Sequence, residues 1–144
     1  MGRLIFFLSL ILVGFQSCSN SDDDNPYMDS VCDEITRVDK NRFEQLQSEG
    51  FEIADVQVNG DCLEVEIISG GCSGETWKAE LIDAGYIAES YPVQRGLKLI
   101  LENKELCNAV VSRRFTFDLR PVRASGDVVS LNLEHWKEQI RYEY

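Results

Sequence analysis

The sequence has few of the residues that catalytic and metal-binding sites most often use. It contains one histidine, His135, and its 5 cysteines show no Cys-x-x-Cys spacing. Zinc sites need clustered cysteines and histidines, so no metal and no cofactor are expected. Basic residues are scarce as well, because 14 Lys and Arg stand against 25 Asp and Glu, for a formal net charge of −11. Binding to nucleic acid requires a positive surface, and the sequence therefore excludes a nucleic acid partner.

Long apolar runs are also lacking. The run from Leu4 to Phe15 follows a single positive residue, Arg3. It is shorter than the roughly 20 apolar residues that a membrane-spanning helix needs. A short apolar run after a positive charge is typical of a secretory signal peptide, so this segment is set apart from the folded domain.

The residues after this run carry a resemblance. Ser17-Cys18, followed by the acidic run from Ser21 to Asp24, resembles the signal of bacterial lipoproteins, and the acidic run resembles the surface-export signal of Bacteroidota lipoproteins. The resemblance implies cleavage before Cys18 and attachment of lipid to Cys18. Residues 1–17 would then be the signal peptide and residues 18–30 an acidic flexible tether, a role that also suits a run of like charges. The expected location is the outer membrane, on the cell surface or the periplasmic face, and the membrane is the expected partner through this lipid.

From Phe51 onward the sequence alternates between apolar and polar residues. Leu63, Val65 and Ile67 show this period of two, which is typical of a strand buried on one face. About seven such runs, separated by turn signals, indicate an antiparallel β-sandwich of immunoglobulin-like or similar topology. A small closed barrel is the alternative. Residues 31–144 are expected to form this single domain.

Three local structures are predicted within the domain. A helix is expected between an N-cap at Asp39 and a C-cap at Gly50. The stretch Asp61–Asp83 is expected to be one β-hairpin, with its turn at Ser69-Gly70-Gly71. Ala84-Gly85 is expected to form another turn. The segment from Tyr86 to Tyr91 runs into Pro92, which confines this segment to a sheet edge or a loop.

The four cysteines that follow Cys18 indicate two disulfides, because even numbers of cysteines in small exported domains usually pair. Cys62 and Cys72 lie at opposite ends of one predicted strand, about 23 Å apart, whereas a disulfide needs a Cα separation of about 4.4–6.8 Å. With strands that alternate in direction, Cys72 and Cys107 reach the same end of the domain. We therefore predict the pairs Cys32–Cys62 and Cys72–Cys107.

Candidates for catalysis are few. Ser73 lacks the Gly-x-Ser-x-Gly context of a hydrolase nucleophile, and His135 would be its only base. Glu64 and Glu66 share a strand face, about 7 Å apart, and are interpreted as its solvated side. The protein is therefore not expected to be an enzyme, and a hydrolase that uses acidic residues is kept as an alternative.

The segment from Tyr91 to Gly96 is the best candidate for a binding loop. Tyrosine and arginine are enriched at binding hot spots, and Tyr91, Gln94 and Arg95 are the residues expected to contact a partner. A glycan, a peptide or an envelope protein would fit a lipid-anchored binding module. The other interpretation is a structural or inhibitory lipoprotein of the envelope.

A broader resemblance covers roughly Cys32 to Leu119. The sequence is similar to a group of small uncharacterised lipoproteins of Bacteroidota, chiefly flavobacteria, in Asp61-Cys62-Leu63, Ser69 to Gly74, Trp77, Ile87 to Ser90, Pro92 to Arg95, Cys107 and Phe117-Asp118-Leu119. This resemblance implies an exported, disulfide-bonded domain and adds no catalytic residue.

Overall fold

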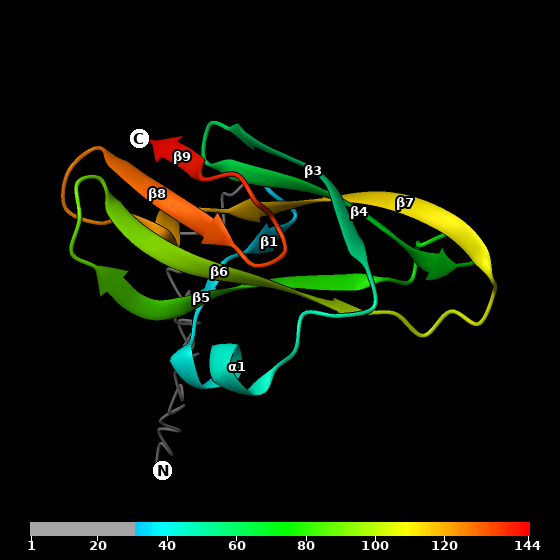
Figure 1. Cartoon of the computed structure of the whole chain (residues 1–144). Helices are drawn as coiled ribbons and strands as arrows, with labels where there is room; N and C mark the ends of the chain where they lie inside the picture. The colour runs from blue at the N-terminus through cyan, green and yellow to red at the C-terminus, as the bar shows by residue number, and fades with distance from the viewer. Residues whose placement is uncertain (1–30) are drawn as a thin grey trace, which may run out of the picture.

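The computed structural model describes residues 31–144, which form two packed β-sheets (Figure 1). The predicted signal peptide, tether and lipid-bearing Cys18 lie outside the described residues. The first sheet has the order β1 (Glu34–Ile35), β7 (Ala109–Asp118), β4 (Cys62–Gly71), β3 (Glu52–Asn59). The second has the order β2 (Arg37–Val38), β5 (Lys78–Ala88), β6 (Val93–Glu102), β8 (Val128–Leu133), β9 (Ile140–Glu143). The predicted β-sandwich is confirmed.

The core lies between the two sheets and is built from the alternating residues of their strands. Leu63, Val65 and Ile67 of β4 are fully buried, as the alternation predicted. The second sheet supplies the opposite layer, with buried residues that include Leu81, Leu97, Leu99, Val129 and Leu131. Burial of such side chains contributes about 1.5–3 kcal/mol each, so this layer is the main source of stability.

The predicted hairpin Asp61–Asp83 is wrong, because its two strands belong to different sheets. β4 pairs with β3 and β7, whereas β5 pairs with β2 and β6. Residues 72–77 cross from one sheet to the other, and Ser69 to Gly71 still belong to β4. A period of two reports which face of a strand is buried, and this is the same whether the next strand lies beside it or across the core.

The predicted turn at Ala84-Gly85 is a bulge within a longer strand. The register of β5 against β6 shifts between Asp83 and Ile87, and β5 continues to Ala88. Gly85 has a φ of +73°, a conformation that glycine adopts at little cost, which explains the turn-like signal. Pairing is also less regular than expected, since β1–β7, β2–β5 and β6–β8 are parallel.

A short helix, α1 (Lys40–Gln45), lies against the second sheet (Figure 1). Its predicted N-cap is confirmed, since Asp39 Oδ1 accepts the Arg42 N–H at 3.0 Å. The predicted end at Gly50 is wrong. Lys98 Nζ donates to the carbonyls of Phe43 at 2.7 Å and Leu46 at 3.0 Å, and these bonds satisfy the last turn there. A 3-10 turn, η1 (Arg120–Val122), follows β7. No helix among residues 31–144 is long and apolar enough to span a bilayer.

Both predicted disulfides are present, at opposite ends of the sandwich. The Cα atoms are 5.7 Å apart in Cys32–Cys62 and 4.9 Å apart in Cys72–Cys107. β4 runs from the first disulfide to the second, so we call the two ends the Cys32 end and the Cys107 end. The Cys32 end includes the connection between β5 and β6, and the Cys107 end includes the start of β7 (Figure 1).

Candidate functional site

Exposed large apolar side chains lie at the end of β5 and on the connection from β5 to β6. Tyr91 is 95% exposed, Tyr86 58% and Ile87 49%. We call residues 86–92 the hairpin tip: it comprises the end of β5, where Ala88 pairs with Gln94, and the connection that leads to Val93 of β6. An aromatic side chain held in water offers a large contact area to a partner, so this tip is a candidate binding surface.

Of the three predicted contact residues, only Tyr91 lies on the exposed tip. β6 begins at Val93, so the loop is shorter than the predicted segment from Tyr91 to Gly96. Gln94 Nε2 donates to Ser90 Oγ at 3.2 Å, and its Oε1 accepts from Asn132 at 3.2 Å and Gln139 at 3.4 Å. Gln94 therefore joins the tip to the neighbouring β8 side of the sheet.

Arg95 was expected at the surface but is buried. Its side chain is 7% exposed and forms a two-point ion pair with Asp83, which is fully buried. Arg95 Nε lies 2.9 Å from Asp83 Oδ2, and its Nη2 lies 2.6 Å from Asp83 Oδ1. Asp83 Oδ1 also accepts the Gly85 N–H at 2.8 Å. Arg95 thus fixes the bulge of β5 beneath the tip and is not a contact residue.

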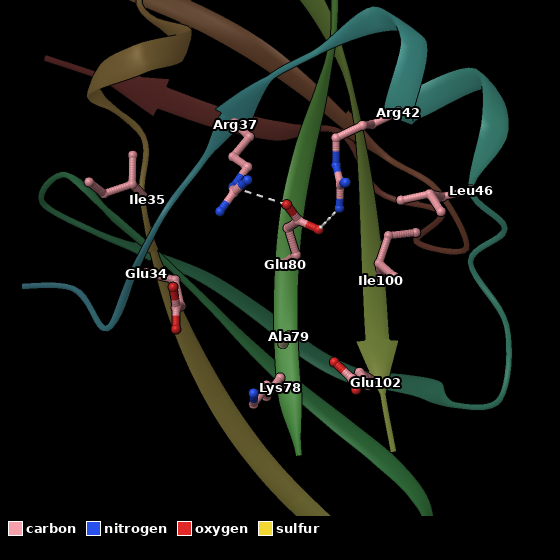
Figure 2. Close-up of a pocket in the computed structure, with 10 residues that line it drawn as sticks. All are labelled: Glu34, Ile35, Arg37, Arg42, Leu46, Lys78, Ala79, Glu80, Ile100 and Glu102. Atoms are coloured by element: carbon pink, nitrogen blue, oxygen red, sulfur yellow. Dashed lines mark hydrogen bonds and ion pairs between the residues drawn. The ribbon is translucent and has the colours of Figure 1, made fainter. Parts of the chain in front are cut away.

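A second candidate is a hollow of about 610 Å³ between α1, the β1–β2 segment and the outer side of β5 and β6 (Figure 2). Arg37 Nε lies 3.0 Å from Glu80 Oε1, and Arg42 Nη2 lies 2.5 Å from Glu80 Oε2. Figure 2 shows the two guanidinium groups approaching this one carboxylate from opposite sides. Lys78 and Glu102 also line this hollow, at the bottom of the view in Figure 2, so it mixes positive and negative groups. Its arginines already have a carboxylate partner, which makes it a weaker candidate than the hairpin tip.

The turn around Ser73 is organised by a carboxylate. Glu105 Oε2 accepts the backbone N–H groups of Cys72 at 2.5 Å, Ser73 at 3.0 Å and Gly74 at 3.1 Å, and Oε1 accepts Thr76 Oγ1 at 2.9 Å. Partial desolvation alone would raise the pKa of Glu105, but these hydrogen bonds outweigh it and lower that pKa to about 2. The backbone N–H groups of this turn, which are the kind of donors that stabilise an oxyanion, are thus bound by the carboxylate of Glu105.

The other residues considered for catalysis also have structural partners. His135 Nε2 lies 2.9 Å from the carbonyl oxygen of Ser48, and Cys72, the neighbour of Ser73, is in a disulfide. Arg114 lies 2.9 Å from Glu66 and 3.7 Å from Glu64, so it joins the two carboxylates. The described residues contain no group of three or more His, Cys, Asp or Glu that could hold a metal ion.

A polar triad closes the Cys32 end. Tyr142 donates from its hydroxyl to Asp61 Oδ1 at 2.6 Å, and Arg123 contacts the same carboxylate oxygen at 2.6 Å. The hydrogen bond from Tyr142 is the main cause that lowers the pKa of Asp61. Burial, followed by the bond to Asp61, raises the pKa of Tyr142 to about 12. Arg123 Nε also donates to the Tyr142 hydroxyl at 2.9 Å, so the triad is mutually satisfied.

The fold and surface together define a disulfide-bonded, two-sheet β-sandwich with an exposed aromatic tip. No family model matches the sequence, and no curated protein matches it. A protein of unknown function, DUF1344, from Bacteroides vulgatus is 16% identical with a TM-score of 0.49, over 77% of this chain and 55% of that one. A putative toxin-related protein from Parabacteroides distasonis is 15% identical with a TM-score of 0.44, over 76% of this chain and 60% of that one. The chain spans less than two thirds of the length of each.

The sequence did not predict two features: the bonds of Glu105 to the turn around Ser73, and the Asp83–Arg95 ion pair beneath the hairpin tip. Nothing local to Glu105 marks it, because its hydrogen-bond partners lie about thirty residues earlier in the chain. Asp83 and Arg95 are a different case. Each occupies an inward position in an alternating strand, and two opposite charges at buried positions of neighbouring strands were a readable signal for an internal ion pair.

Proposed function

We propose that this protein is a lipid-anchored binding module of the bacterial envelope and that the hairpin tip is its contact surface. The observation that carries the proposal is the exposure of Tyr86 and Ile87 at the end of β5 and of Tyr91 on the connection that follows it. Large apolar side chains cost free energy when they remain exposed, and a folded monomer keeps them together where they meet a partner.

The support beneath the tip favours this role over a passive one. The Asp83–Arg95 pair holds the bulge from which the tip extends, and Gln94 bonds to Ser90 at its base. A contact loop that is already ordered loses less conformational entropy when it binds, so a given contact area yields more affinity. An acidic chain with an aromatic contact surface suits a glycan or an uncharged envelope protein.

The anchor is tested by changing Cys18→Ser in the natural host. Loss of the lipid should move the protein from the membrane fraction to the soluble fraction, because the acidic chain has no charge attraction to anionic lipid. Retention of the variant in washed membranes would refute attachment through Cys18.

The contact surface is tested with a matched pair of variants. Tyr91 is 95% exposed and Leu106, at the Cys107 end, is 94% exposed, so Tyr91→Ala and Leu106→Ala each remove a similarly exposed large side chain, from opposite ends. Retention of the released protein on isolated envelope polysaccharide and on delipidated envelope protein is then measured. The proposal expects a loss of retention on one of these two materials with Tyr91→Ala and none with Leu106→Ala. Equal behaviour of the two variants would refute it and favour a structural or inhibitory lipoprotein.

A further inference from the structure

Strand β7 has a long unpaired edge. In the order β1-β7-β4-β3, β4 pairs with β7 along its whole length, from Ala109 to Asp118. On the other side β1 pairs only with Phe117 and Asp118. Within the part of the chain that the structure describes, no strand covers the outer edge of β7 from residue 109 to 116.

The direction of the backbone groups along this edge follows from the two positions, Asp118 and Thr116, whose outward backbone groups are hydrogen-bonded to the segment around β1. Thr36 N–H donates to the Asp118 carbonyl at 3.2 Å, and Thr116 N–H donates to Asp33 Oδ2 at 3.2 Å. The backbone N–H and C=O groups of Asp118 and Thr116 therefore point away from β4. Successive residues of a strand alternate in direction, so Val110, Ser112 and Arg114 also present their N–H and C=O groups to the open side.

The other outer strands carry the features that normally prevent edge pairing. β3 has a register shift between Ile53 and Asp55, β2 has only 2 residues, and β9 has only 4. Bulges and short strands are known protections of sheet edges. The first half of β7 has neither a bulge nor a proline, and Val110 in it is 83% exposed. Among the described residues, this is the longest regular edge of the first sheet that no strand covers.

We propose that an extended segment of a partner protein adds to the first sheet along Val110, Ser112 and Arg114 of β7. Three outward N–H and C=O pairs in a row are complementary to a peptide backbone in the extended conformation. This surface lies toward the Cys107 end of the sandwich, so the inference goes beyond the contact proposed for the hairpin tip.

The neighbouring side chains indicate the chemistry of the segment. Val110 is 83% exposed at this end of β7 and offers an apolar contact to a segment added beside it. An apolar side chain of the segment fits at that end. Toward Arg114 the outer face carries Asp33, Glu64 and Glu66 against the single cation of Arg114. That excess of negative charge favours a segment with basic or neutral polar residues and disfavours an acidic one.

The same charges argue against a second copy as the occupant. Pairing of two β7 edges would bring together two chains that each carry a formal net charge of −11. It would also place the acidic outer faces of both first sheets side by side, and like charges across a strand pair destabilise it. A partner of neutral or basic character has no such penalty.

The test uses the ¹⁵N-labelled full chain and two capped heptapeptides, one alternating Val with Lys and one alternating Val with Glu. We expect the Val-Lys peptide to shift the amide signals of Val110, Ser112 and Arg114 more than that of Val111. We also expect it to bind at least about 10-fold more tightly than the Val-Glu peptide, in line with a favourable charge contact.

Substitutions on the β7 edge show whether the peptide binds there or elsewhere on the domain. Val110→Lys should weaken binding of the Val-Lys peptide by about 10-fold, and Tyr91→Ser at the hairpin tip should leave it unchanged. Ser112→Pro removes an outward N–H and should abolish binding, and if that variant does not fold then Val110→Lys decides the matter. The proposal is overturned if neither peptide shifts these amides at millimolar concentration, or if both bind equally. It is also overturned if the amides shift with protein concentration alone and sedimentation shows a doubled mass, which would make a second copy the occupant.

Discussion

The buried ion pair between Asp83 and Arg95 provides the sharpest test of the structure. Replacing Arg95 with methionine keeps most of the side-chain volume but removes two donors, at 2.9 and 2.6 Å from the carboxylate. Asp83 would then be a fully buried charge that keeps its hydrogen bond from the Gly85 N–H but has lost its cation. Removing one partner of a buried pair costs about 3–5 kcal/mol, a large share of the roughly 5–15 kcal/mol that stabilises a typical domain.

Urea unfolding under non-reducing conditions measures this loss. Arg95→Met should lower the free energy of unfolding by about 3–5 kcal/mol with an unchanged m-value. Adding Asp83→Leu should recover much of it, because no buried charge is left and only the acceptor for Gly85 is missing, at about 1 kcal/mol. The matched control is Arg141→Met, which breaks an exposed pair with Glu143, 61% and 66% exposed, and should cost less than about 1 kcal/mol. A cost below about 1 kcal/mol for Arg95→Met, or a double variant that is worse than either single one, would refute the buried pair.

Three further predictions concern groups outside this pair. Because the pKa of Glu105 is lowered to about 2, its stabilising effect should be complete above its ordinary value of 4.5 and be lost as the pH falls from there toward 2. Glu105→Gln should make the melting temperature depend less on pH over that interval. The same dependence on pH in the variant and the unchanged protein would contradict this. Tyr142→Phe should raise the pKa of Asp61 in an NMR titration, since its hydrogen bond is the main lowering cause; an unchanged value would be contrary evidence. Lys98→Met should speed amide exchange in α1, whose final carbonyls it holds, while exchange in β4 stays constant; equal protection of α1 in both proteins would contradict that role.

The sequence predicted those features that depend on local pattern and chain direction. Alternation along β4 identified its buried face correctly, and the direction of the strands was enough to pair Cys72 with Cys107. The N-cap of α1 was also readable, because it depends on Asp39 and the residues immediately after it. Such features need no knowledge of which strands are neighbours.

The features that depend on neighbours could not be predicted in the same way. Placement of β5 in the second sheet is set by packing across the core and by the bonds of Glu105 to the crossing segment. The early end of α1 is set by Lys98, more than fifty residues away. The candidate surface was affected likewise, since the Arg95 side chain turns inward to Asp83 while Tyr91 remains in water.

The first disulfide determines how the domain would respond to a pulling force from its N-terminal side. β1 is only 2 residues long, and on its own it would peel from the sheet one hydrogen bond at a time. Cys32, just before β1, is covalently joined to Cys62 at the start of β4, which is paired on both sides, with β3 and with β7. Tension transmitted through residue 32 therefore passes through the disulfide directly to β4 and bypasses β1, so the domain should keep this short strand in place under a load applied from its N-terminal side.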